Sequence, residues 1–450
     1  MEKLTAKEIA AWSRGKLIGE DVTIEKIVRD NREINGGELF VALCGEKFDG
    51  HDFVSSAEEN GAACALVSRE VEGVSIAQIV VEDTVEALGD IAKGYLSKFD
   101  ISRVCITGSV GKTTTKEMCA AVLSAGFNTH KTQGNFNNNI GLPLTVFGLE
   151  KSHEAAVFEI GTNHFGEILP LALIAKPDVA LITTIGASHL EAFGTKEGVL
   201  REKTEIFKGL SENGTAVLNG DDPLLWGYRD KAPANTVWFG IENPECDVFG
   251  EIISNGVYES AFRVRGSDRE FSLACGGEHN IRDALSAIAV GRSLGMKDEK
   301  IAEGLRSFKN TGMRQDIYEY NGVVVIRDCY NANPDSMKAS ISLLESFKNA
   351  GKKICVLGDM LELGENASEL HREVGAFAAE KADFVFTAGN FAEAYKAGAG
   401  EKAFVFENKE MIAKKLSEIL TAGDVILVKG SYGTKMWQVL EYLQAEKECK

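Results

Sequence analysis

Short apolar runs alternate with helical stretches through most of the chain, and this alternation constrains the fold more than any other feature. In the middle of the chain, runs that begin at Val104, Ala156, Val179 and Ala216 have the length and composition of buried strands. Helical stretches, such as residues 114–125 and 196–210, separate them. Strands that alternate with crossover helices pair in parallel. We therefore predict a parallel sheet that binds ligands beyond the carboxyl ends of its strands.

The same alternation divides the chain into three regions. Residues 98–310 hold the runs described above, and residues 311–450 hold a second set, in which three of the four apolar runs lead into a glycine within a few residues. Residues 1–97 form a smaller α/β unit. At roughly 150 residues per domain, a chain of 450 residues has room for about three domains. We predict an α/β protein of three domains, with a parallel sheet in the centre and a doubly wound sheet at the end.

A glycine-rich turn follows the first predicted strand of the central region and opens a predicted helix. It reads Gly108-Ser109-Val110-Gly111-Lys112-Thr113-Thr114. Its glycines let several backbone N–H groups face one anion, and the helix N-terminus adds its dipole. Lys112 would reach the β- and γ-phosphates of a nucleotide, and the Thr113 hydroxyl would bind Mg²⁺. A full P-loop has its first glycine at the position of Ile106, so a structural turn capped by Thr113 is the alternative; the strand before and the helix after favour phosphate.

Three further side chains of the central region are candidates for chemistry, and for each the residue pattern leaves a structural role open. Glu159 ends an apolar strand, where either a divalent cation next to Thr113 or a Lys or Arg partner would neutralise it. His189 follows another strand, and a hydrogen-bonded structural histidine is its alternative. Lys203, between acidic neighbours, is by default a solvated helix lysine.

Two polar segments are not explained by packing. Residues 135–141 hold four asparagines in five positions, although asparagine has poor helix and strand propensity. Amides donate and accept hydrogen bonds, which suits sugar hydroxyls or a pyrophosphate, and an Asx-turn loop is the alternative. Residues 328–336 are similarly polar after a strand of the third region, with Arg314 a short way upstream.

The charge balance and the cysteines limit the partners and the compartment. Acidic residues number 67 and Lys plus Arg number 49, a net charge of −18, so we expect no nucleic-acid partner. No apolar run approaches the ~20 residues of a membrane span, so we expect no membrane insertion. The nine cysteines form no C-x-x-C pair, which is typical of free thiols in a reducing compartment. Because the first residues lack the apolar core of a signal peptide, we predict a cytoplasmic protein.

Taken together, these residues resemble the Mur ligases, ATP-dependent enzymes that form amide bonds in peptidoglycan precursors. The resemblance covers essentially the whole chain. It rests on residues 37–43, 49–51, 108–114, 134–138, 159–164, 189–191, 330–336, 357–364 and 429–431. Within the family, residues 331–336 and 358–364 are most similar to the member that joins D-alanyl-D-alanine to UDP-N-acetylmuramoyl-tripeptide through an acyl phosphate, giving the pentapeptide precursor, ADP and phosphate.

The resemblance implies a role for each domain. Residues 1–97 would bind the UDP end of the substrate, residues 98–310 would form a P-loop-type ATP-binding domain, and residues 311–450 would form a Rossmann-like ligase domain. It further implies a monomer that uses ATP and two Mg²⁺ ions.

The resemblance also implies a role for each candidate residue. Thr113 and Glu159 would share one Mg²⁺, while His189 and Lys203 would serve a second, with Lys203 carbamylated after losing its proton. The implied ATP contacts are Gly108, Ser109, Val110, Gly111, Lys112, Thr113, Thr114, His279, Asn280, Asp283, Arg314 and Asp328. The implied catalytic set is Lys112, Glu159, His189, Lys203, Arg314 and Asp328. The implied substrate contacts are Asn31, Arg32, Gly45, Asp49, Gly50, His51, Asn135, Asn137, Asn138, Asn331, Asn333 and Asp335.

Three positions depart from the family pattern. The family often has Ser or Thr at Asn31, which is a mild polar change. It has Asn at Asp283, and a carboxylate there accepts but cannot donate a hydrogen bond to adenine or ribose. It has Arg at Tyr432, so a cation that could face a substrate carboxylate is missing.

Three other functions compete with this interpretation. A sister ligase would add a different amino acid. Folylpolyglutamate synthase would share the central domain, but the first domain and residues 331–336 argue against it. A P-loop switch would bind nucleotide without ligating anything, and it would leave the asparagine-rich segment and the third domain without a role.

Overall fold

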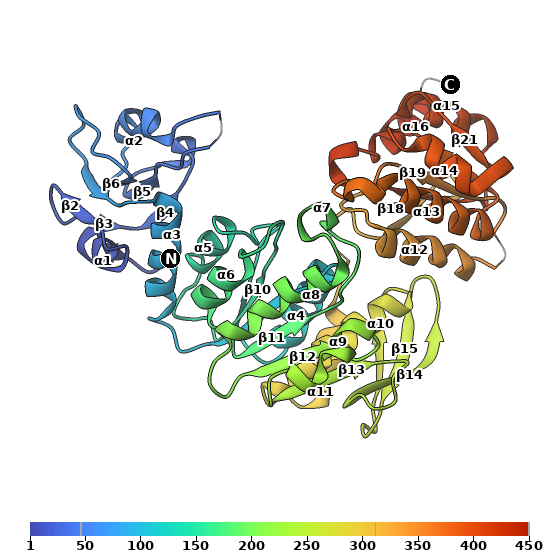
Figure 1. Ribbon diagram of the computed structural model, residues 1–450, viewed down its shortest axis with the longest axis horizontal. Coiled ribbons are helices and arrows are strands. Elements are labelled where there is room, and N and C mark those ends of the chain that lie inside the picture. Colours follow the sequence, from blue (N-terminus) through green and yellow to red (C-terminus); the bar gives the residue numbers. More distant parts are fainter. Residues whose placement is uncertain (46, 311, 349, 449–450) are drawn as a thin grey trace.

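The computed structural model describes residues 1–45, 47–310, 312–348 and 350–448. Three α/β lobes follow one another in chain order along an arc, with the N-terminal lobe in blue and the C-terminal lobe in orange and red (Figure 1). The predicted α/β fold with three parts is thereby confirmed. Residue 311, at which we expected the third domain to begin, lies outside the described residues.

The N-terminal lobe has a five-stranded sheet in the order β2-β7-β6-β5-β4, in which only the edge strand β2 is antiparallel to its neighbour. A two-stranded sheet of β1 and β3 lies beside it. The strands are β1 (Leu4–Thr5), β2 (Lys16–Ile18), β3 (Thr23–Ile24), β4 (Lys26–Val28), β5 (Glu38–Val41), β6 (Cys64–Val67) and β7 (Ala77–Val80), and the helices are α1 (Ala6–Trp12), α2 (Val54–Glu59) and α3 (Thr84–Leu96).

The central lobe is built on a nine-stranded sheet in the order β16-β15-β14-β13-β12-β11-β8-β10-β9. The strands are β8 (Ser102–Thr107), β9 (Thr129–Lys131), β10 (Ala155–Glu159), β11 (Val179–Ile182), β12 (Thr215–Asn219), β13 (Thr236–Gly240), β14 (Val248–Asn255), β15 (Ser260–Val264) and β16 (Glu270–Leu273). The helices are α4 (Lys112–Ser124), α5 (Gly141–Val146), α6 (Ile168–Ala175), α7 (Leu190–Phe193), α8 (Lys196–Lys203), α9 (Pro223–Gly227), α10 (Glu278–Ser293) and α11 (Asp298–Ser307).

The central sheet differs from our expectation at one end. Strands β9 to β14 pair in parallel as predicted, but β14, β15 and β16 continue the sheet as an antiparallel meander. Short connections such as residues 256–259 are too brief for a crossover helix, so these strands can pair only in antiparallel fashion.

The C-terminal lobe has a six-stranded sheet in the order β17-β18-β22-β19-β20-β21, parallel except for the edge strand β17. The strands are β17 (Asp316–Tyr320), β18 (Val323–Asp328), β19 (Lys353–Leu357), β20 (Phe384–Thr387), β21 (Ala403–Val405) and β22 (Val425–Lys429). The helices are α12 (Pro334–Ser342), α13 (Ala367–Lys381), α14 (Ala392–Ala399), α15 (Lys409–Ile419) and α16 (Gln438–Glu448).

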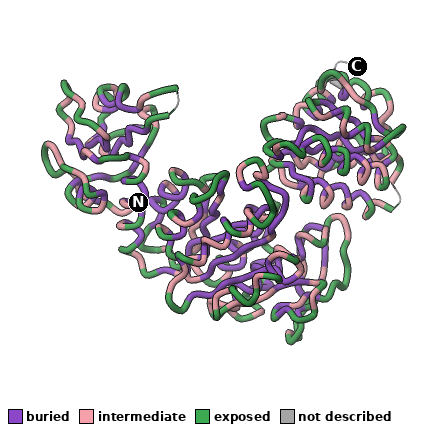
Figure 2. The backbone as a smooth tube through the Cα atoms, in the orientation of Figure 1, coloured by how far each residue is buried: buried purple, intermediate pink, exposed green. Residues whose placement is uncertain are grey.

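The sheets form the buried interior of each lobe, and the helices and loops around them are more exposed (Figure 2). In the central lobe, β8 lies between β10 and β11, and Ile106 pairs with Glu159 on one side and with Leu181 on the other. The carboxyl ends of these three strands therefore lie side by side, and so do the loops that follow them. Among the described residues, no helix is long and apolar enough to cross a membrane.

Candidate active site

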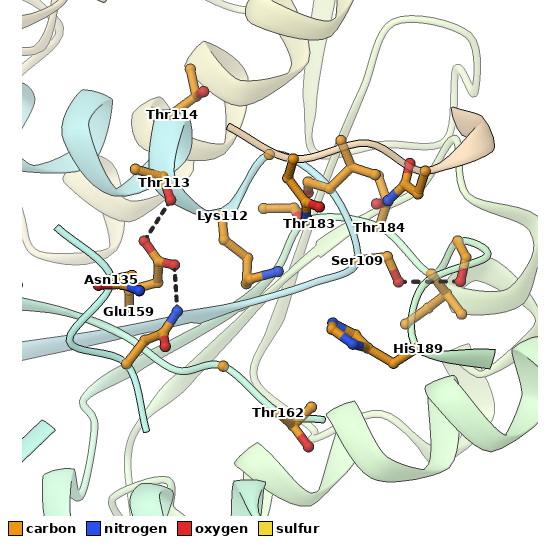
Figure 3. Close-up of a pocket in the computed structure, with 18 of the residues that line it drawn as sticks. Ser109, Lys112, Thr113, Thr114, Asn135, Glu159, Thr162, Thr183, Thr184 and His189 are labelled. Carbon is orange, nitrogen blue, oxygen red and sulfur yellow. Dashed lines mark hydrogen bonds between the residues drawn. The ribbon is translucent and has the colours of Figure 1, made fainter. Parts of the chain in front are cut away.

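A cavity of about 1260 Å³ lies beyond the carboxyl ends of the central strands and has a second wall made by the C-terminal lobe. It brings together most of the predicted site residues, some of which are drawn in Figure 3. From the central lobe these are Ser109, Val110, Gly111, Lys112, Thr113, Thr114, Asn135, Asn137, Asn138, Glu159, His189, His279, Asn280 and Asp283. From the linker and the C-terminal lobe they are Arg314, Asp328, Asn331, Asn333 and Asp335.

The predicted phosphate loop has the backbone of an anion-binding turn. Gly111 adopts φ +85° immediately before α4, so the helix begins at Lys112, two residues earlier than predicted. Gly108 adopts φ +149°, and a side-chain carbon there would lie 1.9 Å from Thr183 Oγ1. Gly108 does not itself line the cavity, and it shapes the turn from behind. Both positions require glycine, because a side chain would meet either backbone strain or a close neighbour.

Lys112 lies half-buried between Glu159 and His189, with its amine donating a hydrogen bond to the Gly108 carbonyl at 2.7 Å (Figure 3). Burial lowers the pKa of Lys112, and the positive charge of Arg314 lowers it further, while Glu159 opposes the shift. A multiply charged phosphate would reverse this imbalance, which favours an anion beside Lys112.

Glu159 and Thr113 present hard oxygen atoms to the cavity. Thr113 donates its hydroxyl proton to Glu159 Oε2 at 2.8 Å (Figure 3). Asn137 donates its amide N–H to Glu159 Oε1 at 2.9 Å. This donor set suits Mg²⁺, which prefers oxygen ligands. The alternative of a lysine partner is also realised, since Lys116 Nζ lies 3.9 Å from Glu159 Oε2.

His189 is not free in this arrangement. It follows β11 with a left-handed φ of +51°, and its Nδ1 lies 2.5 Å from Glu362 Oε2 of the C-terminal lobe. The pair joins the central lobe to the C-terminal lobe, and of its two members only His189 lines the cavity. His189 Nδ1 could bind a cation only after parting from Glu362.

The default expectation for Lys203, a solvated helix lysine, is wrong. Its side chain is 1% exposed, because α8 turns this face inward. Burial lowers the pKa of Lys203 well below its usual value, and the nearby charge of Lys112 adds to the shift. Among the described residues, none makes a hydrogen bond or ion pair with its amine. Lys203 does not line the cavity surface itself but lies behind it.

Several side chains of the polar segments 135–141 and 328–336 are already engaged in hydrogen bonds within the protein. Asn138 Oδ1 accepts hydrogen bonds from the backbone of Ile140 and Gly141, as in the Asx-turn alternative. Asn333 caps α12 by accepting from the Ser336 N–H at 2.8 Å. These two asparagines therefore shape the walls, and Asn137 contacts Glu159 instead.

The wall formed by the C-terminal lobe holds several charged side chains, among them Asp328 and Lys429. Burial alone would raise the pKa of Asp328, but Lys429 at 2.6 Å and the Ser340 hydroxyl lower it below its usual value. The Arg314 guanidinium lies 3.8 Å from the centre of the Tyr330 ring. Lys429 is almost fully buried and was not among our site residues, although it belongs to a segment of the family pattern.

Two further residues of the cavity region were missed. Gln315 accepts hydrogen bonds from His279 and Asn280, both at 2.9 Å, and so ties the linker to the predicted adenine contacts. Lys116 is buried one helical turn beyond Lys112. The spacing of Lys112, Thr113 and Lys116 on one helix was the signal that could have identified Lys116.

The predicted residues of the N-terminal lobe do not line this cavity. Asn31 donates to Ser56 Oγ at 3.0 Å, and Arg32 forms an ion pair with Asp30. Gly50 lies against the Leu43 backbone, which leaves no room for a side chain, and Gly45 accommodates the Phe48 ring. These contacts all lie within the N-terminal lobe, and the binding of UDP by these residues stays a prediction.

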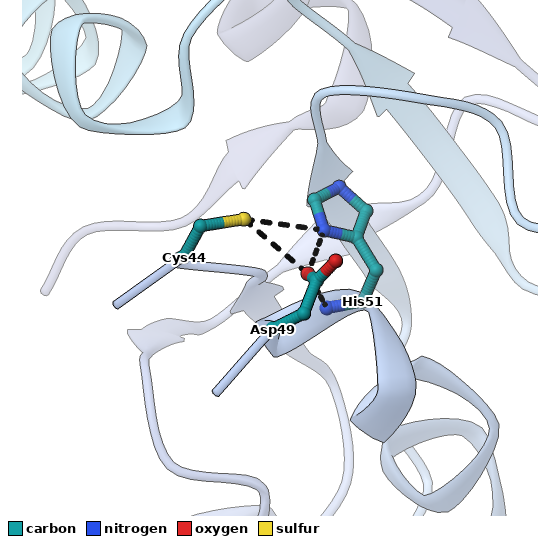
Figure 4. Close-up of side chains that lie close together, drawn as sticks. All are labelled: Cys44, Asp49 and His51. Carbon is teal, nitrogen blue, oxygen red and sulfur yellow. Dashed lines mark hydrogen bonds and ion pairs between the residues drawn. The ribbon is translucent and has the colours of Figure 1, made fainter. Parts of the chain in front are cut away.

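Asp49 and His51 form a closed cluster with Cys44 (Figure 4). The Ser68 N–H donates to His51 Nε2 at 2.9 Å, so Nδ1 carries the proton and donates to Asp49 at 2.6 Å. Arg69 pairs with the other carboxylate oxygen, and this pair is the main reason why the pKa of Asp49 is lowered. Because Nδ1 is protonated, the cluster is unsuited to hold a metal ion.

Models of known families match three segments of the chain. Residues 23–96 match the model described as Mur ligase family, catalytic domain. Residues 106–291 match the Mur ligase middle domain, and residues 313–432 match the model described as Mur ligase, glutamate ligase domain. Together these segments cover more than half of the chain.

Individual relatives match over the full length. The chain is 39% identical to the UDP-N-acetylmuramoyl-tripeptide–D-alanyl-D-alanine ligase of Bacillus subtilis, over 98% of this chain and 99% of the relative. A crystal structure of MurF from Acinetobacter baumannii superposes with a TM-score of 0.94 at 33% identity and 99% coverage of both chains. MurF ligase from Thermotoga maritima in complex with ADP superposes with a TM-score of 0.85 at 34% identity, covering 94% of this chain and 98% of that one.

Proposed function

The chain belongs to the Mur ligase family, and from that premise we propose that it joins D-alanyl-D-alanine to UDP-N-acetylmuramoyl-tripeptide with ATP as phosphoryl donor. The products are the UDP-linked pentapeptide precursor, ADP and phosphate. One observation carries the proposal. A phosphate loop with Lys112 and Glu159 on one wall faces Asp328 and Asn331 on the other, within a single cavity.

The residues of the cavity suit an acyl-phosphate mechanism. A peptide carboxylate is a poor electrophile, so it attacks the γ-phosphorus of ATP first, and the amine of D-alanyl-D-alanine then attacks the acyl carbon and expels phosphate. Lys112 and the N–H groups of its loop neutralise the charge on the phosphates. The polar wall of the C-terminal lobe, which includes Asn331 and Asp335, would hold the dipeptide.

Two metal sites belong to this proposal. Thr113 and Glu159 would hold one Mg²⁺, and His189 with Lys203 would serve the second. Bound Mg²⁺ supplies positive charge where the transferred phosphoryl group develops negative charge. Carbamylation requires a neutral amine, and the lowered pKa of Lys203 supports that requirement.

The C-terminal lobe would close the cavity over the bound nucleotide. Water would hydrolyse the acyl phosphate, so the cavity must exclude it while the intermediate exists. The linker around Arg314 and Gln315 joins the lobes, and it is suited to let the C-terminal lobe move over the nucleotide.

We further propose that the enzyme acts as a monomer in the cytoplasm. The eight described cysteines are free thiols, as a reducing compartment maintains them, and Cys449 lies outside the described residues. Both walls of the cavity come from one chain. Light scattering on the purified protein should give the mass of one chain, and a stable dimer would contradict the proposal.

Phosphate release from the full-length protein tests the function. We expect release only when ATP, UDP-N-acetylmuramoyl-tripeptide and D-alanyl-D-alanine are all present. Release that needs neither acceptor would favour a nucleotide switch. Release with a single amino acid in place of the dipeptide would favour a sister ligase.

A further inference from the structure

Lys116 is an almost fully buried cation that the proposed reaction does not use. Its side chain is 1% exposed, on the inner face of α4. A buried ammonium needs nearby negative charge, because removing it from water is costly. The residues that provide this charge are therefore informative about its role.

Two carboxylates lie near the Lys116 amine, at different distances. Glu117 Oε1 is 3.0 Å away, and Glu159 Oε2 is 3.9 Å away. The second atom is the same oxygen to which Thr113 donates its hydroxyl proton. Lys116 thus faces the pair of oxygen atoms that would hold the first Mg²⁺.

The carboxylates of this cluster are fully compensated without a metal ion. Glu117 and Glu159 carry two negative charges, and Lys116 and Lys131 carry two positive charges, with Lys131 paired to Glu117. The Lys112 amine adds a further positive charge that interacts with Glu159. Glu159 is 3% exposed at its side chain, so water compensates little of its charge. A divalent cation would bring a repulsive charge close to Lys116, unless the ammonium withdraws to Glu117.

We propose that Lys116 is a positioning residue that acts as the internal counter-ion of the metal site. It compensates Glu159 while no cation is bound and turns wholly to Glu117 when one arrives. This inference rests on the proposed binding of Mg²⁺ by Thr113 and Glu159. It does not depend on which substrates the enzyme joins.

Two variants should shift metal affinity in opposite directions. Lys116→Met removes a positive charge beside Glu159, so Mn²⁺ should bind more tightly, by on the order of tenfold. Glu117→Gln removes the carboxylate to which Lys116 withdraws, so the ammonium stays on Glu159 and Mn²⁺ should bind several-fold more weakly. Lys131→Met is the matched control, since Lys131 pairs with Glu117 but, among the described residues, forms no ion pair with Glu159.

The experiment uses the full chain without nucleotide and follows free Mn²⁺ by electron paramagnetic resonance. Thermal unfolding in EDTA and in Mg²⁺ gives a second measurement, and Mg²⁺ should raise the Tm of Lys116→Met more than that of the wild type. If Lys116→Met does not fold, the weaker binding by Glu117→Gln still tests the inference.

A purely structural lysine would give a different result. Both variants would then lose stability without opposite shifts in Mn²⁺ affinity, and that outcome would overturn the inference while leaving the metal site intact. A wild-type protein that binds no Mn²⁺ would remove the metal site and the inference together. The proposed ligase function is tested separately, by phosphate release with all three substrates present.

Discussion

Lys112 places its amine 2.7 Å from the Gly108 carbonyl, a contact that a phosphate oxygen would replace. In the proposed reaction this residue would lower the barrier to phosphoryl transfer by compensating the negative charge that develops on the nucleotide. We expect Lys112→Met to reduce turnover by about a hundredfold or more. ADP formation with both acceptors present measures this, and Lys151→Met on the surface serves as the control. Normal turnover by Lys112→Met would contradict the proposed ATP site.

Asp283 makes stability depend on pH. Burial raises its pKa from the usual 3.8 to about 7, although the Thr115 hydroxyl donates a hydrogen bond to it at 3.0 Å. The folded state therefore binds this proton more tightly than the unfolded state, and stability falls as the pH rises from about 4 through 7.

Asparagine at this position carries no charge at any pH. Asp283→Asn should therefore raise the free energy of unfolding by about 1–2 kcal/mol more at pH 8 than at pH 5. Urea unfolding at the two pH values measures the difference. The control is Asp298→Asn: the Arg292 side chain lowers the pKa of Asp298 below its usual 3.8, so the carboxyl is ionised at both pH values and this variant should lose about the same stability at pH 5 and at pH 8. An equal gain by Asp283→Asn at both pH values would contradict the raised pKa.

Among the elements, helix α8 is held against the start of α6 by the buried side chain of Glu202, while the exposed charged side chains of α8 do not make this contact. Glu202 accepts hydrogen bonds from the Gly166 and Ile168 N–H groups at 2.8 and 2.9 Å and is 2% exposed. This anchor joins α8 to the start of α6 and directs the neighbouring Lys203 inward. We predicted one helix over residues 196–210, but α8 ends at Lys203 and tightens into a 3-10 segment, Thr204–Gly209.

Glu202→Gln leaves an amide N–H₂ facing a backbone N–H, so one hydrogen bond is lost and a buried donor is left unpaired. We expect a loss of about 2 kcal/mol in the free energy of unfolding. Glu205→Gln, which breaks an ion pair with Lys208 on the next segment, should change it by less than about 0.5 kcal/mol. Urea unfolding of both variants is the test, and equal losses would argue against the anchor.

At the scale of the molecule, the C-terminal lobe contacts the loop after β11 at two points. Glu362 pairs with His189 at 2.5 Å, and Asp335 accepts from the Ala187 N–H at 3.2 Å. We predict that ATP and UDP-N-acetylmuramoyl-tripeptide together draw the central and C-terminal lobes closer. Small-angle X-ray scattering should show a smaller radius of gyration with both ligands, and no compaction would count against a closing lobe.

The Glu362–His189 pair makes a separate contribution to this arrangement. Glu362→Gln removes the charge that holds His189, so the ligand-free protein should have a larger radius of gyration than the wild type. Glu365→Gln is the control because Glu365 is exposed on the same turn and, among the described residues, forms no ion pair. Identical scattering from both variants would show that the pair does not hold the lobes.

The class of fold, the buried strands and the phosphate loop were predictable from residue order alone, because these features depend on local patterns. The short apolar run of residues 179–182 forms a strand as its length and composition predict, and Gly108 and Gly111 adopt the positive φ angles that the turn needs. The resemblance to the family likewise predicted most of the residues that line both walls of the cavity.

The pairing of charged side chains, in contrast, depends on how the folded elements pack. The burial of Lys203, the approach of Lys116 to Glu159 and the pairing of His189 with Glu362 join residues from different elements. The antiparallel end of the central sheet was missed for a related reason, since strand direction depends on how neighbours pair. Burial and electrostatic pairing are properties of positions in space, and residue spacing along the chain does not specify them.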